Sequence, residues 1–217
     1  MTRETEVLEQ AELESLLAQV NSRTPSGARN FALLQLMAQT GIRCGEALQV
    51  TAADIRQDDY PKNGGTVKVW TLRLPTRATK GKKARDPIPL TAATRRALDA
   101  WQAKRVALGA PGGPMFCTIT DGAVKGFGGE ADTQPGKPLN PRYVRELVAR
   151  LAAKAGIGRR VHPHMLRHTA LTALYDKTQN LLLVQGVAGH STSRMTERYT
   201  HVHPLAVAEA MGAIGEE

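Results

Sequence analysis

One short segment limits the folds open to this chain. Between Thr66 and Leu74, valine and tryptophan alternate with polar residues, and this period of two is typical of a β-strand. A turn signal precedes it at residues 63–65. A shorter strand is expected at residues 86–90, and its two prolines indicate an edge strand, because proline cannot donate a hydrogen bond to a neighbouring strand. The apolar residues of the other periodic segments repeat with the helical period. The sequence therefore predicts a mainly α fold with a small antiparallel β-sheet, an α+β class.

Helices are expected on both sides of this sheet. A capping residue is followed by a first-turn proline at residues 24–25 and again at 140–141, and Gly41 is a C-terminal stop. Residues 121–138, rich in glycine and proline, are expected to form a mobile loop. The expected helices cover residues 11–20, 25–41, 45–50, 91–108, 140–156, 163–177, 180–188 and 191–198.

Length and composition exclude several classes of protein. A chain of 217 residues can bury a core without disulfides, and its two cysteines, Cys44 and Cys117, fit a reduced protein. No apolar run approaches the ~20 residues of a membrane span, and the acidic first residues are unlike a secretory signal. We therefore expect a cytoplasmic protein with no membrane partner.

The net charge of +9 is unevenly distributed. Residues 73–105 carry a net charge of +8 and residues 142–168 carry +6, whereas residues 1–20 carry −4. Two basic blocks in one chain indicate a surface that binds a polyanion. Charge alone leaves DNA, RNA and acidic proteins open as partners, and a solvated basic surface is the alternative.

The segment at residues 162–168 contains candidate phosphate ligands. His164 and Arg167 are three residues apart, so on a helix they share a face. A guanidinium can bind two phosphate oxygens at once, and an imidazole can supply a hydrogen bond or a proton. The ligand spacing of a zinc site is lacking. This pattern suits a phosphate site, and a helix with solvated His and Arg is the alternative.

Four further motifs accompany this segment in a defined order. Gly-Ile-Arg-Cys-Gly-Glu-Ala-Leu at residues 41–48 lies upstream, a basic hairpin at 79–90 follows, and Gly-His at 189–190 and then Tyr199 lie downstream. This set resembles the tyrosine recombinase (phage integrase) family. The family pattern is an arginine in Gly-Leu-Arg-x-x-Glu-Leu, a hairpin lysine, His-x-x-Arg, Gly-His and a tyrosine. The resemblance extends over about residues 13–201 and implies the fold of that family's catalytic domain.

The resemblance implies strand cleavage by a covalent route. Tyr199 would attack a DNA phosphodiester, form a 3′-phosphotyrosine link and release a 5′-hydroxyl. Arg43 and Arg167 would bind the non-bridging oxygens and stabilise the charge that develops on phosphorus. These cations would do what magnesium does in other phosphoryl transfers, so no metal and no cofactor is expected.

The resemblance also assigns the residues that handle protons and orient the site. Lys80 would protonate the leaving 5′-oxygen, His164 would accept the proton of Tyr199, and His190 would donate a hydrogen bond to the phosphate. Glu46 would be a buried carboxylate that orients the site. His168 is expected to be structural.

The remaining bases of the two basic blocks are expected to line the DNA. The DNA-contact candidates are Arg77, Lys82, Lys83, Arg85, Arg142 and Arg145. Either lysine of this set is the alternative to Lys80, which precedes a glycine as in the family's Gly-Lys-Gly pattern.

The implied function is site-specific recombination for DNA integration, excision or resolution. Double-stranded DNA would be the partner, bound at the nucleoid by a homotetramer on paired sites, with a possible accessory DNA-bending or clamp protein. Because the pattern begins near residue 10, we expect one catalytic domain over residues 1–217 without the usual N-terminal core-binding domain. The alternatives are relaxation of supercoils in the manner of a type IB topoisomerase, and a DNA-binding regulator without strand exchange. The tail at 204–217 would dock on a neighbouring protomer or pack on its own core.

Overall fold

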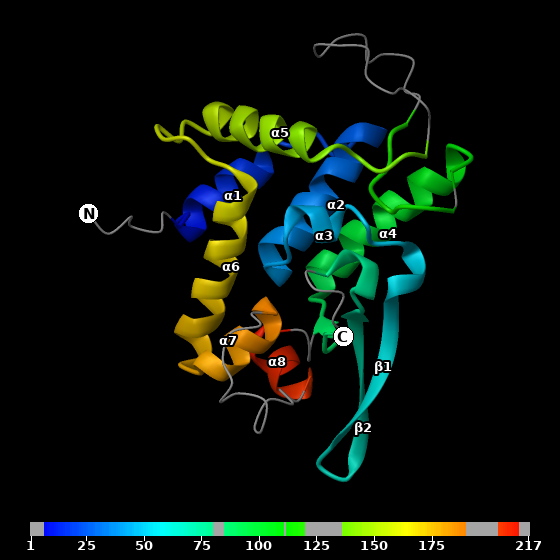
Figure 1. Cartoon of the computed structure of the whole chain (residues 1–217), viewed down its shortest axis with the longest axis vertical. Helices are drawn as coiled ribbons and strands as arrows, with labels where there is room; N and C mark the ends of the chain where they lie inside the picture. The colour runs from blue at the N-terminus through cyan, green and yellow to red at the C-terminus, as the bar shows by residue number, and fades with distance from the viewer. Residues whose placement is uncertain (1–6, 80–84, 111, 120–135, 190–203, 213–217) are drawn as a thin grey trace.

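A computed structural model describes residues 7–79, 85–110, 112–119, 136–189 and 204–212. In chain order the helices are α1 (Gln10–Ala18), α2 (Pro25–Thr40), α3 (Cys44–Ala47), α4 (Ala92–Ala107), α5 (Pro141–Lys154), α6 (Pro163–Thr178), α7 (Leu181–Ala188) and α8 (Pro204–Ala210), with single 3₁₀ turns at Ala52–Asp54 and Thr76–Ala78. The strands are β1 (Ile55–Lys62), β2 (Gly65–Leu72) and β3 (Ile88–Pro89). In Figure 1 the hairpin of β1 and β2 projects from one end of the helical body. The fold is thus mainly α with a small antiparallel sheet, as the sequence predicts.

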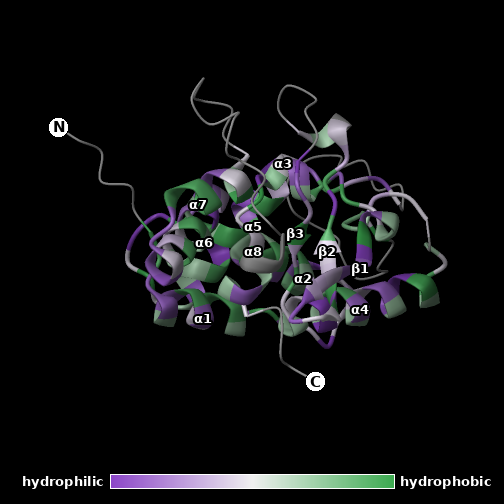
Figure 2. Cartoon of the chain, turned by 90° about the horizontal axis from the view of Figure 1, so that it is seen from below, coloured by the Kyte–Doolittle hydropathy of each residue, from purple (hydrophilic) through white to green (hydrophobic). Residues whose placement is uncertain are grey.

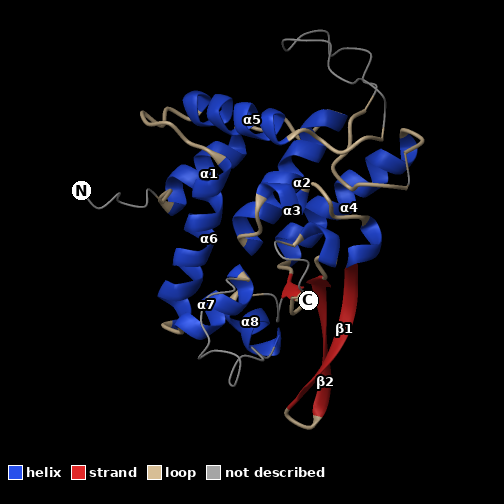
Figure 3. Cartoon of the chain, viewed as in Figure 1, coloured by secondary structure: helices blue, strands red, loops and turns tan. Residues whose placement is uncertain are grey.

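The sheet has the order β1-β2-β3, with both pairings antiparallel (Figure 3). The two long strands pair from Ile55 opposite Leu72 to Lys62 opposite Gly65. Asn63 and Gly64 join them with φ values of 50° and 79°, so both occupy the left-handed region that a two-residue hairpin turn requires. The turn signal in the sequence therefore marks the tip of this hairpin.

The strand β1 is absent from the sequence prediction, which pairs 66–74 with 86–90 alone. In the structure β3 covers only two residues, and β1 supplies the long pairing of the sheet. Only Ile55 of β1 is buried, and the remainder of its sequence, Arg-Gln-Asp-Asp-Tyr-Pro-Lys, has no apolar alternation. An exposed edge strand needs no apolar face, so the pattern that reveals β2 does not reveal β1.

The core is built around α2, which lies between α1 and α4 and also contacts α3 and α6 (Figure 1). Five of its residues are fully buried, and they follow one another closely: Ala32, Leu33, Leu34, Leu36 and Met37. The expected start and stop signals are confirmed. The Thr24 side chain accepts a hydrogen bond from the Gly27 backbone, and Gly41 ends the helix with φ 64°. In Figure 2 hydrophilic and hydrophobic residues both occur along α1 and α4, as expected for helices with one face on a core.

The other helices occur close to their expected positions, whereas the expected helix at 191–198 and most of the expected loop at 121–138 lie outside the described residues. In the tail, Val207 and Ala208 of α8 are buried, and α8 contacts β3 and α6. The described part of the tail therefore packs on its own chain. Among the described helices, none combines the length and apolarity needed to cross a membrane.

Candidate active site

The junction between α2 and α3 positions Arg43. Gly41 ends α2 in the left-handed conformation, and Ile42 is fully buried beside it. Arg43 then precedes α3, and its backbone nitrogen donates to Oε2 of Glu46 at 2.8 Å. Its guanidinium donates through Nη1 to Oε1 of the same carboxylate at 2.9 Å. The guanidinium is therefore fixed by a residue one turn later, while a third of the side chain stays exposed.

Glu46 binds a second guanidinium. It is 2% exposed, and its Oε1 accepts from Nη2 of Arg85 at 2.6 Å. Arg85 lies just before β3, so this ion pair attaches the end of the basic hairpin segment to the α2–α3 junction. The prediction that Glu46 orients the site agrees with this geometry. Arg85 differs from its expected place on an open DNA-contact surface: its side chain is only 8% exposed and faces Glu46.

Arg167, in the second turn of α6, links two other parts of the fold. It is 3% exposed, and it donates through Nη1 to the Gly41 carbonyl at 2.7 Å and through Nη2 to the Ala188 carbonyl at 2.8 Å. It thereby holds the end of α2 against the end of α7. Burial, and then the neighbouring charge of Arg43, lower the pKa of Arg167 to about 10. The group stays protonated at neutral pH, but poorly solvated, so an anion placed beside it would be strongly favoured.

Gly189 shows why a glycine precedes the histidine of the Gly-His motif. It ends α7 with φ 59°, a conformation that side chains rarely adopt. A Cβ atom here would also collide with the guanidinium of Arg85. The backbone at Gly189 therefore lies directly against the Arg85 guanidinium that pairs with Glu46.

His164 stands one turn before Arg167 on α6, as the sequence predicts. Its ring lies edge-on to that of His168, with centroids 4.2 Å apart, and stacks more distantly on His162 at 6.4 Å. Partial burial, then the charges of His168 and Arg167, lower the pKa of His164 below 6.5. The imidazole is therefore mostly neutral at pH 7, which is the form that can accept a proton.

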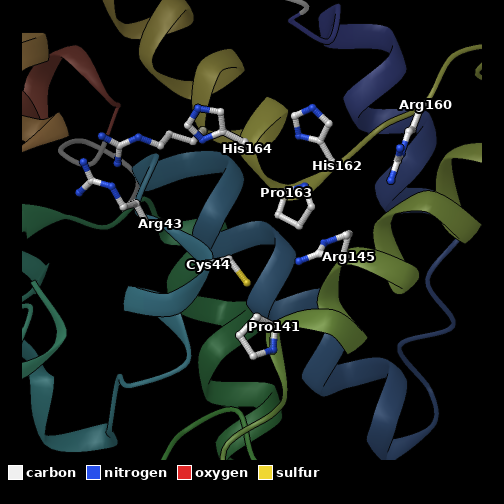
Figure 4. Close-up of a pocket in the computed structure, with 9 residues that line it drawn as sticks. Arg43, Cys44, Pro141, Arg145, Arg160, His162, Pro163 and His164 are labelled. Carbon is white, nitrogen blue, oxygen red and sulfur yellow. The ribbon is translucent and has the colours of Figure 1, made fainter. Parts of the chain in front are cut away.

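These residues face one pocket of about 790 Å³ (Figure 4). Arg43, His164 and Arg167 line it, and so does Arg145, one of the predicted DNA contacts. The other lining residues are Cys44, Pro141, Arg160, His162 and Pro163. The sequence predicts no role in the site for Arg160 or His162. Burial raises the pKa of the Cys44 thiol to about 11, so this side chain is neutral in the pocket.

Two predicted features lie elsewhere in the structure. Arg142 is exposed on α5, donates to Glu146 at 2.8 Å and is not among the residues that line the pocket. The Tyr143 hydroxyl, also on α5, accepts from Arg29 and Asn30, so this phenol has a structural role. Within the described ranges, no cluster of three or more His, Cys, Asp or Glu residues is arranged to hold a metal ion.

Several predicted site residues cannot be placed in this geometry. The residues outside the described ranges are Lys80, Lys82, Lys83, His190 and Tyr199, and the side chain of Arg77 is likewise not described. The nucleophile and the general acid therefore remain predictions from the sequence.

A comparison with known proteins identifies the family. Residues 6–205 match the model of the phage integrase family. The chain belongs to the phage integrase family. Among curated members, it is 34% identical over 182 residues to tyrosine recombinase XerC of Bifidobacterium longum, covering 82% of this chain and 45% of that protein. It is 33% identical over 197 residues to XerC of Bacillus licheniformis, covering 90% of this chain and 56% of that protein. The chain thus spans about half the length of these phage integrase relatives.

Solved structures give the same family fold. The complex of XerH site-specific recombinase with its difH substrate, described as a pre-cleavage complex, matches with a TM-score of 0.64 and 28% identity, covering 93% of this chain and 52% of that one. XerA recombinase matches with a TM-score of 0.64 and 19% identity over all of this chain and 66% of that one, and supports the fold alone. The expectation of a phage integrase catalytic domain is confirmed at the level of family and fold.

Proposed function

We propose that this chain is the catalytic domain of a site-specific recombinase that cuts and rejoins DNA through a 3′-phosphotyrosine. One observation carries the proposal: Arg43 and Arg167 line the same pocket, one fixed by Glu46 and the other by two backbone carbonyls. Two guanidiniums held in this way are preorganised donors for the non-bridging oxygens of a phosphodiester. The names of the relatives, tyrosine recombinases that include one bound to its DNA substrate, support the same reaction.

The chemistry divides between described residues and those known from the sequence. The Tyr199 oxygen attacks phosphorus while the bond from phosphorus to the 5′-oxygen breaks. His164 takes the phenolic proton, for which its lowered pKa suits it, and Lys80 delivers a proton to the leaving oxygen. His190 donates a hydrogen bond to the phosphate. Since the phosphotyrosine conserves the energy of the phosphodiester, attack by a 5′-hydroxyl of another strand rejoins the DNA.

The proposal includes the partners. The chain binds double-stranded DNA and works as a homotetramer on paired sites at the nucleoid in the cytoplasm, with an accessory bending or clamp protein. The exposed and pocket-facing bases Arg142 and Arg145 are its proposed contacts to the backbone, together with the hairpin bases Arg77, Lys82 and Lys83. Residues 1–217 act as one catalytic domain, and the single core shared by α2, which leads to Arg43, and α6, which carries His164 and Arg167, supports this.

A nicked suicide duplex tests the reaction. The DNA that becomes covalently attached to the chain in its host is sequenced first, and a duplex with that site and a nick beside it is then used in vitro. We expect a covalent protein–DNA adduct that disappears in Tyr199→Phe and persists in the control Tyr175→Phe, which changes an exposed tyrosine on α6.

The same assay separates the alternatives. Supercoil relaxation without exchange between two sites would favour a type IB topoisomerase. DNA binding without an adduct on the trapped site would favour a regulator, and it would overturn the recombinase proposal.

A further inference from the structure

The pocket has a second basic half that the cleavage chemistry does not use. In Figure 4 Arg43 and His164 lie at one side, Arg145 and Arg160 lie at the other, and His162 stands between them. Arg145 comes from α5, whereas Arg160 and His162 come from the short segment just before α6. Two segments of the chain thus bring basic groups to one side of the pocket.

The pairing of these arginines differs from that of their neighbours. Arg142 lies one turn before Arg145 on α5 and donates to Glu146. Arg159 precedes Arg160 and donates to Glu12 and to the Val7 carbonyl. Arg145 and Arg160 form no hydrogen bond and no ion pair with the described part of the chain. These two neighbours therefore have acids, whereas Arg145 and Arg160, which line the pocket, are open to an external anion.

Two helix ends add to the positive potential. Pro141 and Pro163 are the first residues of α5 and α6, and both line this pocket. A helix N-terminus carries a partial positive charge, equivalent to about half an elementary charge. The volume of 790 Å³ equals about 26 water molecules at ~30 Å³ each, which is far more room than one phosphate group needs.

We propose that Arg145, Arg160 and His162 bind a second backbone phosphate, next to the one bound by Arg43 and Arg167 on the same DNA strand. The inference rests on the proposed function, and it goes beyond a general DNA contact by Arg145 because it assigns one phosphate to three named residues. Phosphates of one strand follow each other at ~3.4 Å along the helix axis, so neighbours can enter the same pocket. Holding two of them fixes the direction of the strand across the catalytic arginines.

Salt dependence on a random-sequence duplex is the first test, and it needs no target site. Losing one phosphate contact lowers the slope of log affinity against log salt by about 0.9, so between 50 and 200 mM salt the affinity of Arg160→Gln falls about 3.5-fold less than that of the wild type. Arg145→Gln should behave alike. The matched control Arg159→Gln changes the adjacent arginine, which is paired with Glu12, and should leave the slope unchanged.

A neutral phosphate analogue is the second test and locates the contact. Methylphosphonates are placed one at a time on either side of the scissile phosphate in the trapped site. In wild type one adjacent position should weaken binding by about ten- to hundredfold, as expected for loss of a charge-assisted hydrogen bond. In Arg160→Gln the same methylphosphonate should have a clearly smaller effect, because only Arg145 and His162 still lose a contact, whereas in Arg159→Gln it should retain its full effect.

The outcomes separate this inference from the function on which it rests. An unchanged salt slope, or a methylphosphonate effect of equal size in Arg160→Gln and wild type, overturns the second phosphate site while adduct formation stands. A chain that binds no DNA overturns both. Circular dichroism checks that the exposed substitutions leave the fold intact.

Discussion

Arginines on the outer surface and arginines around the pocket are paired in different ways. On the outer surface several guanidiniums each have a carboxylate of their own. The surface pairs are Arg73–Asp58, Arg95–Asp99 and Arg142–Glu146. At the pocket Arg43 and Arg85 share the single carboxylate of Glu46, and Arg167 is held by carbonyl groups. The local excess of cations over carboxylates, more than the net charge of the chain, therefore indicates where an anion binds.

The energetics of the two regions differ for the same reason. An exposed ion pair contributes only about 0–1 kcal/mol, since water solvates both partners well. Removing a buried carboxylate from between two guanidiniums costs more free energy of folding, because the positive charges left behind are unpaired and poorly hydrated. Four predictions test this difference, and the first has the largest expected effect.

Replacing the shared carboxylate should destabilise the fold. Glu46→Gln leaves Arg43 and Arg85 without their anion, and breaking a buried pair of this kind costs about 3–5 kcal/mol. Urea unfolding measures the loss. The control Glu146→Gln breaks an exposed pair on α5 and should change the free energy of unfolding by no more than about 0.5 kcal/mol. Equal losses in the two variants would show that the buried and exposed pairs do not differ.

Arg167→Lys should lower the rate of adduct formation by about 10²–10³, the cost of losing one preorganised donor to a developing oxyanion. Lysine keeps the charge, but it cannot bond both the Gly41 and Ala188 carbonyls and still face the phosphate. The control is Arg95→Lys, which alters a guanidinium stacked on Trp70 and paired with Asp99. Single-turnover cleavage of the suicide duplex measures both variants. A wild-type rate in Arg167→Lys would contradict the catalytic assignment.

The sequence predicted most of the helices and the chemistry of the site for a physical reason. Caps, stop glycines and apolar periodicity are local signals, and they placed α2 and α6 within a residue or two. Arg43 and Arg167 belong to short motifs whose order resembles the tyrosine recombinase pattern, and that resemblance assigned both to a phosphate site. Their common location depends on Gly41, whose carbonyl accepts from Arg167 while its left-handed turn leads the chain to Arg43.

What the sequence did not predict depends on contacts between distant segments. Arg85 resembles any other base of the hairpin, and only the fold shows that Glu46, 39 residues earlier, takes up its charge. Arg160 is adjacent to Arg159 and of the same type, yet one faces the pocket and the other Glu12. The edge strand β1 carries no apolar alternation. Residues of the same type thus differ in their ion-pair partners and in their exposure to solvent, and no local sequence pattern encodes either property.

A smaller effect is expected at Gly189, where the buried pair meets the Gly-His segment. Gly189→Ala forces a side chain into φ 59° and against Arg85, at a cost of about 1–2 kcal/mol for the backbone alone. Arg85→Ala removes the collision, so the double variant should be more stable than the sum of the single losses predicts, by at least about 0.5 kcal/mol. The control Gly158→Ala has nothing near its Cβ and should be nearly neutral. Strict additivity would contradict the contact.

The smallest effect is the pH dependence of cleavage, which tests whether surplus cations reach His164. An imidazole with a pKa of 6.5 would be half protonated at pH 6.5 and would halve the rate. Partial burial and the charges of His168 and Arg167 lower the pKa of His164. The cleavage rate at pH 6.5 should therefore be less than twofold below its plateau, and cleavage should be lost only at lower pH. Because of the same shift, the folded chain binds fewer protons than the unfolded chain, so the stability of the fold also decreases as the pH is lowered below 6.5. Circular dichroism must therefore confirm the fold at each pH. His168→Phe removes one neighbouring charge and should move the midpoint up towards 6.5. A midpoint at or above 6.5 in the wild type would mean that the cations beside the pocket do not act on the proton acceptor.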